Sequence, residues 1–263
     1  MTVENRCKRK MLAGEPALGA WLAMGSPIAA EIVANAGYDT VIMDHEHGPG
    51  DLLNAISLMQ AAASSGVTPM MRVPWNDMVY IKRALDIGVM GVVVPYVQNA
   101  AEAEAAVAAC RYPTGGVRGV APHAARCSGW GSRLKPYLAA MPDELLVACQ
   151  IETEEAIDNI EEIAAVDGVD MLFLGPSDVS ASIGHMLDME EPKVIRLLQK
   201  AERKMRATGK LLATVTRPGK SVKWTFERGY DLVVCGQDAK LLQGAALAQV
   251  KEFRDSPPKK RTR

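Results

Sequence analysis

The stretch "TPMMRVPWNDMVYIKRALDIGVMGVVVPYV", residues 68–97, contains one complete unit of a repeated pattern. An apolar run, "TPMMRV", is followed by a helical pattern over 77–87 and then by a second apolar run, "GVVVPYV". Both runs are almost wholly apolar rather than alternating, which is typical of parallel strands covered on both faces. Gly88 directly follows the helical pattern, where a glycine often ends a helix. The stretch therefore predicts a strand, a helix and a parallel strand.

The same unit recurs along the chain. Further apolar runs begin at Ala17, Asp39, Leu145, Val169, Lys210 and Asp231. Other helical patterns cover 28–36, 52–65, 100–109, 154–165, 192–207, 219–228 and 238–253, and the Gly- and Pro-rich stretch 111–134 indicates a long loop. Eight strand–helix units within about 250 residues predict a single (β/α)8 TIM barrel in the α/β class. A doubly wound open sheet is the alternative.

Composition limits the possible partners. The chain has 263 residues, of which 48% are hydrophobic and 23% charged, as in soluble globular proteins. Its formal net charge of -1 gives no electrostatic case for nucleic acid or an anionic membrane. No apolar run has the length or position of a signal peptide or a membrane span. We therefore expect a cytoplasmic protein with no nucleic-acid or membrane partner.

The cysteines and the chain end support this expectation. The five cysteines are odd in number and scattered without a CxxC motif, which indicates reduced thiols rather than a disulfide framework. No linker divides the chain, so we expect one barrel domain over 1–255. The end "SPPKKRTR", residues 256–263, is predicted to be a disordered basic tail.

Polar side chains gather at the predicted strand ends. Because catalytic residues of such barrels lie at the carboxyl ends of the strands, we expect these side chains to face one another. They are Asp44, His45, Glu46 and His47 after the second strand, Arg72 after the third, Gln150 and Glu152 after the fifth, and Ser177 and Asp178 after the sixth.

Three of these residues also have a simpler interpretation. Arg72 is explained by a surface ion pair, and Glu152 by capping of the next helix together with Thr153. Asp178 in "GPSDVS" has the residue type of a helix N-cap. Charges at four neighbouring strand ends are nevertheless hard to explain by caps alone.

Other chemistries lack their motifs. His45 and His47 resemble half of a zinc site, but no third histidine stands at ligand spacing. "RPGKS" fails as a phosphate-binding loop because Thr214 stands where the first glycine should be. There is no GxGxxG and no GxSxG motif. A Schiff-base aldolase needs a lysine inside the barrel, and only Lys210 falls on a predicted strand, at its inert end.

The remaining set suggests chemistry on a 2-oxo acid. Glu152 and Asp178 are hard oxygen ligands, and a site with two protein carboxylates suits Mg²⁺ or Mn²⁺. Arg72 offers a planar fork of donors for a carboxylate or an enolate oxygen. A histidine beside the metal moves protons at neutral pH, and a buried acid can orient it. Metal, arginine and a histidine–aspartate pair together describe enolisation with the metal as Lewis acid.

The chain resembles the HpcH/HpaI family, the metal-dependent (class II) pyruvate aldolases of aromatic and sugar-acid catabolism. The resemblance rests on "AGYDTVIMDHEHGP", "MMRVPWND", "RYPTGGVRG", "QIETEEAIDNIEEIAAVDGVDMLFLGPSDVSASIG" and "GYDLVVCGQD", which are specific in combination. It implies reversible cleavage of a 4-hydroxy-2-oxo acid into pyruvate and a small aldehyde through a metal-bound pyruvate enolate. It also implies a metal held by Glu152 and Asp178, with Mg²⁺ or Mn²⁺ expected and Co²⁺ as an alternative.

The resemblance assigns the other roles as well. It places the catalytic base on His47 and the acid that raises the basicity of that histidine on Asp86 of "LDIG". Arg72 stabilises the enolate, and Asp44 assists the proton relay. The substrate-binding positions are Gln150 and the backbone of Ser177. For His45, shaping of the aldehyde pocket and simple packing both remain open.

Assembly and substrate choice are also expectations. The resemblance implies that the last helix packs on a neighbouring subunit, in trimers paired into hexamers. Oxaloacetate decarboxylation or macrophomate synthase-like enolate chemistry is the alternative on the same site. A citrate lyase β-subunit-like activity lacks an obvious basic patch for CoA, and a non-catalytic 2-oxo-acid-binding protein is a third class. The aldehyde is unidentified, and its pocket is expected around 123–130, with a neighbouring subunit as a second source.

Overall fold

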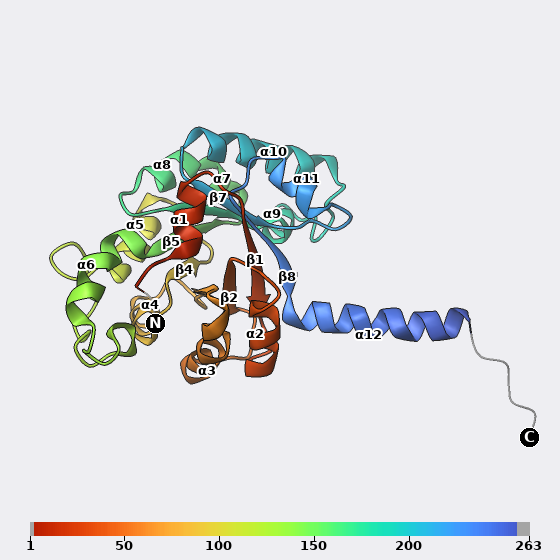
Figure 1. Cartoon of the computed structure of the whole chain (residues 1–263). Helices are drawn as coiled ribbons and strands as arrows, with labels where there is room; N and C mark the ends of the chain where they lie inside the picture. The colour runs from red at the N-terminus through yellow and green to blue at the C-terminus, as the bar shows by residue number, and fades with distance from the viewer. Residues whose placement is uncertain (1–2, 257–263) are drawn as a thin grey trace, which may run out of the picture.

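The computed structural model describes residues 3–256. Eight parallel strands form a closed barrel in chain order, with β8 paired to β1 (Figure 1). The strands are β1 Ala17–Leu22, β2 Thr40–Asp44, β3 Thr68–Arg72, β4 Gly91–Val94, β5 Leu146–Ile151, β6 Met171–Leu174, β7 Leu211–Val215 and β8 Leu232–Gln237. All eight predicted strands are present, and the predicted (β/α)8 barrel is confirmed.

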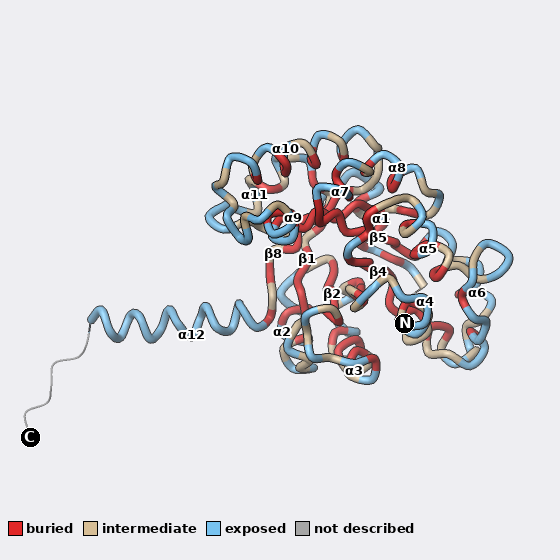
Figure 2. Tube along the Cα trace, turned by 180° about the vertical axis from the view of Figure 1, so that it is seen from behind, coloured by how far each residue is buried: buried red, intermediate tan, exposed pale blue. Residues whose placement is uncertain are grey.

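Successive side chains along each strand point alternately into the barrel and toward the helices, so they form two buried layers. Ile42, Met70 and Ala148 belong to the cluster that also contains Trp21 and Phe173, whose rings lie 5.9 Å apart inside the barrel. Their neighbours along the strands pack instead in the larger cluster shared with the helices. Strands covered on both faces have no polar face, which is why their sequences lack alternation (Figure 2).

The helices follow the predicted order with some additions. The expected ones are α2 Pro27–Ala34, α3 Leu52–Ala62, α4 Met78–Ile87, α5 Ala100–Cys110, α7 Glu154–Asp158 with α8 Ile160–Ala165, α10 Pro192–Ala207, α11 Val222–Phe226 and α12 Asp238–Asp255. The sequence did not predict α1 Arg6–Leu12, α6 Leu134–Glu144, α9 Pro176–Ser182 or the 3-10 turn η2 Arg126–Ser128. The helix predicted over 52–65 ends in a 3-10 turn, η1 Ala63–Ser65.

Two local features explain where helices end. Gly88 has φ +98, the left-handed conformation that favours glycine, and it ends α4 as predicted. The helix expected over 154–165 is instead two helices, because Asn159 departs from helical geometry. The side-chain amide of Asn159 donates a hydrogen bond to the carbonyl of Gln98 at 2.9 Å, which fixes the break.

The first and last helices differ in what they cover. Cys7 and Met11 of α1 join the interior cluster, so this helix closes the amino end of the barrel. In contrast, α12 extends away from the barrel and is exposed beyond its first residue (Figures 1 and 2).

The described residues bear on two further expectations. No described helix is long and apolar enough to cross a membrane. Apart from Ser256, the predicted basic tail lies outside the described residues, and the division into one domain over 1–255 stays a prediction.

Candidate active site

The carboxyl ends of the strands surround a cavity of about 780 Å³. Asp44, Arg72 and Gln150 stand two residues beyond interior positions of their strands, so each side chain points to the barrel axis. Among the predicted site residues, six line this cavity: Asp44, His47, Arg72, Gln150, Ser177 and Asp178. The expected convergence of strand ends is therefore present.

Arg72 is held on three sides. Its Nε and Nη2 donate to the two carboxylate oxygens of Asp44 at 2.9 and 2.7 Å, and its Nη1 lies 3.0 Å from Glu46. Its guanidinium stacks 4.5 Å over the ring of Trp21. Burial raises the pKa of Asp44, but the hydrogen bond and charge of Arg72 outweigh it and the net pKa is lowered. A forked pair of this kind fixes the guanidinium plane at the cavity wall.

The loop after β2 separates its two histidines. Oδ1 of Asp44 accepts the backbone N–H groups of Glu46 and His47, each at 3.2 Å, which turns His47 into the cavity. The buried ring of His45 packs elsewhere, with its Nδ1 2.7 Å from the hydroxyl of Tyr80 on α4. The two imidazoles thus have different surroundings. Because His45 faces Tyr80 and His47 faces the cavity, the two rings are not placed to share a zinc ion. Among residues 3–256 there is no group of three or more His, Cys, Asp or Glu side chains of the kind that holds a metal ion.

Glu152 belongs to the site rather than to a helix end. Its Oε2 accepts the backbone N–H of Tyr96 at 2.8 Å, and its Oε1 accepts the side-chain amide of Gln150 at 2.6 Å. The cap of α7 is made by Thr153, whose hydroxyl accepts the N–H of Ala156. The capping interpretation of Glu152 is therefore wrong.

Asp178 also does not cap a helix. It lies in the first turn of α9, whose N-cap is Gly175 and which has no side-chain cap. The N-cap interpretation is wrong, and the carboxylate lines the cavity instead.

The two carboxylates converge over Gly175. A Cβ atom at this glycine would lie 3.0 Å from Oε1 of Glu152 and 3.4 Å from Oδ2 of Asp178. Burial and the charge of Asp178 raise the pKa of Glu152 to about 7. Within the described chain, Oε1 of Gln150 is also buried without a partner. Two mutually repelling carboxylates beside a free amide oxygen are a hard oxygen donor set that fits a divalent cation such as Mg²⁺ or Mn²⁺.

Asp86 does not lie with the other predicted residues. It sits in the last turn of α4, which runs back from the carboxyl end of β3 toward the amino end of β4. Its carboxylate accepts a hydrogen bond from Nη2 of the buried Arg118 at 2.7 Å. His47 and Asp86 of one chain therefore lie at opposite ends of the barrel, so within the chain Asp86 is not in contact with His47.

The loop expected to form the aldehyde pocket is also at the other end. Residues 123–130 follow α5 and precede β5, so they lie near the amino ends of the strands, where Arg126 donates to the carbonyl of Ile87 at 2.6 Å. None of them lines the cavity. Within one chain this expectation is wrong.

Several site residues were not predicted. Trp21 and Phe173 line the cavity, and Tyr96 holds Glu152 from a left-handed backbone with φ +56. Thr216, Arg217, Gln237 and Lys240 line it from the ends of β7 and β8. The strand-end rule, applied to the first, seventh and eighth strands as well, would have indicated Trp21, Thr216 and Gln237.

The sequence model of the HpcH/HpaI aldolase/citrate lyase family matches residues 17–245. The chain belongs to this family. It is 39% identical over 251 residues to the 4-hydroxy-2-oxo-heptane-1,7-dioate aldolase of Escherichia coli (strain ATCC 8739), with 95% of each protein covered. This membership confirms the resemblance drawn from the sequence and its expectation of carbon–carbon lyase chemistry of the aldolase type.

Solved structures of the family have the same fold. A family protein from Burkholderia cenocepacia J2315 superposes with a TM-score of 0.89 at 32% identity, covering 95% of this chain and 99% of that one. An HpcH/HpaI aldolase from Desulfitobacterium hafniense DCB-2 gives 0.86 at 30% identity, covering 95% and 97%.

Proposed function

We propose that the protein is a divalent-metal-dependent aldolase that cleaves and forms 4-hydroxy-2-oxo acids, giving pyruvate and an aldehyde. The observation that carries this proposal is the pair of carboxylates, Glu152 and Asp178, which converge beside Gly175 at the edge of a cavity that Asp178 and Arg72 line. The relative in Escherichia coli, which is named for an aldolase acting on such an acid, supports the same reaction.

Glu152 and Asp178 would hold the ion, which is Mg²⁺, Mn²⁺ or Co²⁺. When bound, the ion supplies a Lewis acid that polarises the keto oxygen of the 2-oxo acid. Gln150 and Ser177 line the cavity beside these carboxylates, and we assign them to substrate binding. The amide oxygen of Gln150, which has no partner among residues 3–256, is available for this contact.

Proton transfer is assigned to His47. Its ring lines the cavity and its side chain is 66% exposed, so it can exchange protons with solvent. Arg72 faces the same space with a fixed guanidinium, which suits it to the negative charge of an enolate. Asp44 contacts Arg72 and the backbone of the His47 loop, so it positions both groups. This positioning is the part that we propose for Asp44 in the relay.

Asp86 acts on a histidine only if another subunit supplies it. We propose a homo-oligomer of the trimer or hexamer type in which α12 packs on a second copy. The exposed apolar residues of α12 support this assembly: Leu241, Leu242, Leu247, Val250 and Phe253. Light scattering of the parent should give a multiple of 28.3 kDa, and Leu247→Asp should lower the mass.

The proposed place of the reaction is the cytoplasm. All five cysteines lie within residues 3–256 and are free thiols, four of them buried, as in a reducing compartment.

Deuterium exchange into pyruvate tests the proposal without knowledge of the aldehyde. In D₂O with Mg²⁺ or Mn²⁺, the parent should exchange the methyl protons of pyruvate, and a chelator should stop the exchange. His47→Ala should exchange roughly 100-fold more slowly, the usual scale for a lost general base, whereas His45→Ala should retain much more.

The controls separate the alternatives. If the parent shows no exchange with any divalent metal, the pyruvate-enolate reaction is excluded. Loss of exchange in His45→Ala, with near-parent exchange in His47→Ala, would reverse the assignment of the two histidines. Oxaloacetate decarboxylation measured alongside would reveal whether this reaction is the faster one on the same site.

A further inference from the structure

A second cavity lies at the amino end of the barrel, away from the proposed active site. Its volume of about 840 Å³ is in the range of small-molecule sites and is no smaller than the 780 Å³ of the cavity at the carboxyl end. Leu145, Asp170 and Lys210 line it immediately before β5, β6 and β7. Among the described residues, none lines both cavities, so the two spaces are separate.

Apolar side chains line much of this second cavity. They are Val107 and Cys110 of α5, Leu138, Met141 and Pro142 of α6, and Leu145, Val147 and Val169 around the starts of β5 and β6. Leu138 is 42% exposed, which places it at the entrance, whereas Met141 is buried. Walls of this kind suit the apolar body of a ligand.

The acids that line the second cavity, within the described chain, are already compensated. Asp167 lies 2.8 Å from Nη1 of Arg111. Asp170 lies 2.9 Å from Nζ of the buried Lys8 and also accepts the backbone N–H of Val147 at 2.9 Å. Neither carboxylate therefore requires a cation from a ligand.

Two cations at the cavity keep donors that protein groups do not use. Arg118 is 1% exposed, and its Nη2 donates to Asp86 at 2.7 Å, but its Nε is buried without a partner among residues 3–256. Nζ of Lys210 donates to the carbonyl of Val169 at 2.7 Å, and in the same part of the chain Lys210 forms no ion pair. An unsatisfied donor on a buried cation costs free energy, which an anionic ligand in the cavity would offset.

Tyr112 adds an unused donor beside Arg118. Its hydroxyl is buried and has no acceptor among residues 3–256. Its ring lies 4.4 Å from the guanidinium carbon of Arg118, and both residues line the cavity. An aromatic ring beside a guanidinium suits a ligand that combines a flat apolar body with a carboxylate.

We propose that this cavity is a second ligand site and that it binds an aromatic carboxylate. Lys210 and Nε of Arg118 supply cationic donors for the carboxylate, the hydroxyl of Tyr112 supplies a neutral one, and the aromatic body of the ligand lies against Leu138 and Met141. The site does not depend on the proposed aldolase reaction, because the two cavities have no lining residue in common among residues 3–256.

Titration calorimetry with three probes tests the site and its ligand class. The parent should bind 2-naphthoate. It should bind 2-naphthamide, which keeps the rings but lacks the charge, about tenfold or more weakly, the scale of a lost charge-assisted hydrogen bond. Acetate, which has the carboxylate without the rings, should also bind about tenfold or more weakly. Excess pyruvate with Mg²⁺ should leave the Kd of 2-naphthoate unchanged, because pyruvate belongs to the other cavity.

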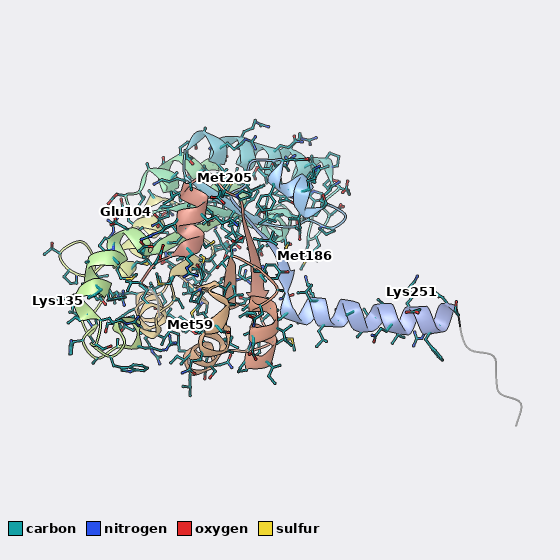
Figure 3. All side chains as sticks on the ribbon, viewed as in Figure 1. Met59, Glu104, Lys135, Met186, Met205 and Lys251 are labelled. Atoms are coloured by element: carbon teal, nitrogen blue, oxygen red, sulfur yellow. The ribbon has the colours of Figure 1, made fainter. Side chains whose placement is uncertain are left out.

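Lys210→Met removes one cation and keeps an apolar side chain of similar length. The Kd of 2-naphthoate should rise about tenfold or more, while pyruvate exchange stays at the parental rate. Lys135→Met makes the same change on an exposed residue of α6 that does not line the cavity (Figure 3), and it should keep the parental Kd. Tyr112→Phe should raise the Kd about threefold or more without lowering the melting temperature, because it removes a hydroxyl that has no acceptor within the described chain.

The outcomes separate this inference from the proposed function. Failure of 2-naphthoate to bind the parent would overturn the second site, and so would an unchanged Kd in Lys210→Met. Binding of 2-naphthamide or acetate as tight as that of 2-naphthoate would overturn the ligand class. Displacement of 2-naphthoate by pyruvate with Mg²⁺ would place it in the cavity at the carboxyl end instead. Absence of pyruvate exchange in the parent would count against the aldolase alone.

Discussion

Two buried glutamates stand at opposite ends of the same strand and behave in opposite ways. Glu144 precedes β5 at the amino end of the barrel, and Glu152 follows β5 at the carboxyl end. Both side chains are nearly closed to solvent, at 6% and 4% exposed. Burial raises the pKa of both, but at Glu144 the hydrogen bonds from Arg9 and from the backbone of Asn5 lower it overall. At Glu152 the charge of Asp178 adds to burial, and the pKa rises to about 7.

The surroundings explain the difference. Glu144 accepts the N–H of Asn5 at 2.6 Å and Nε of Arg9 at 2.9 Å, and nearby Lys8 pairs with Asp170 at 2.9 Å. These charges at the amino end are thus compensated by protein groups and stabilise the fold. Glu152 also accepts hydrogen bonds, from Tyr96 and Gln150, but it forms no ion pair within residues 3–256 and faces another carboxylate, which costs stability unless a cation binds. A buried carboxylate without an ion pair therefore indicates the functional end of this barrel.

Glu152→Gln should give the largest loss of activity. Loss of one of two anionic ligands should lower turnover by roughly 100-fold or more, since even partners behind metal ligands are worth up to that factor. The same change should not lower the stability of the metal-free protein, because it removes repulsion from Asp178. Turnover and thermal melting of Glu152→Gln and Glu144→Gln, measured together, check this prediction. Equal loss of activity in both variants would show that the two ends of the barrel do not differ in function.

Metal addition should stabilise the protein through the carboxyl end of the barrel only, where Glu152 lies. At a metal concentration of about 100 Kd, binding to the native state adds about 2.7 kcal/mol to the free energy of unfolding. The melting temperature of the parent and of Glu144→Gln should therefore rise with Mg²⁺ or Mn²⁺ and fall back with a chelator. Glu152→Gln should show little or no rise. A full rise in that variant would place the ion elsewhere.

Glu144→Gln should weaken the fold instead. Replacing a carboxylate that accepts charged and backbone donors should cost about 2 kcal/mol of unfolding free energy. Because the folded-state pKa of Glu144 lies below its ordinary value of 4.5, its stabilisation is complete above that pH and is lost as the pH falls below it. Melting curves from pH 3 to 7 should show the parent and the variant converging toward low pH. A constant difference would refute the charge contribution.

Arg72→Lys should give the smallest of these effects on activity, roughly tenfold or more. Lysine keeps the positive charge but loses the two-donor plane that Asp44 holds. Steady-state kinetics should place Arg72→Lys close to Arg72→Ala, whereas Arg9→Lys at the amino end should leave turnover near the parental value. Near-parental turnover of Arg72→Lys would show that only its charge matters.

Part of the site followed directly from strand ends. Asp44, Arg72 and Gln150 lie at or near the ends of their strands, and the residue two positions before each of them is in the barrel interior. Because every second side chain of a strand points the same way, these three also point toward the barrel axis. Asp86 and the loop around 123–130 failed the same test. Asp86 lies in the last turn of a helix and the loop comes after one, so both are at the amino end of the barrel. The two groups differ in their place within the strand–helix unit: the first comes at the end of a strand and the second at or after the end of a helix. The family resemblance alone did not contain this distinction.

The sequence by itself determined the eight strands, their order and the side chains that end them, because apolar runs and strand alternation are local properties. The tertiary structure alone decided that Glu152 meets Asp178 while Glu144 meets Arg9, and that Arg217 and Lys240 share one cavity with Asp44. It also decided that α12 leaves the barrel (Figure 1). Charge interactions and burial depend on distances between residues far apart in the chain, and no local pattern contains those distances.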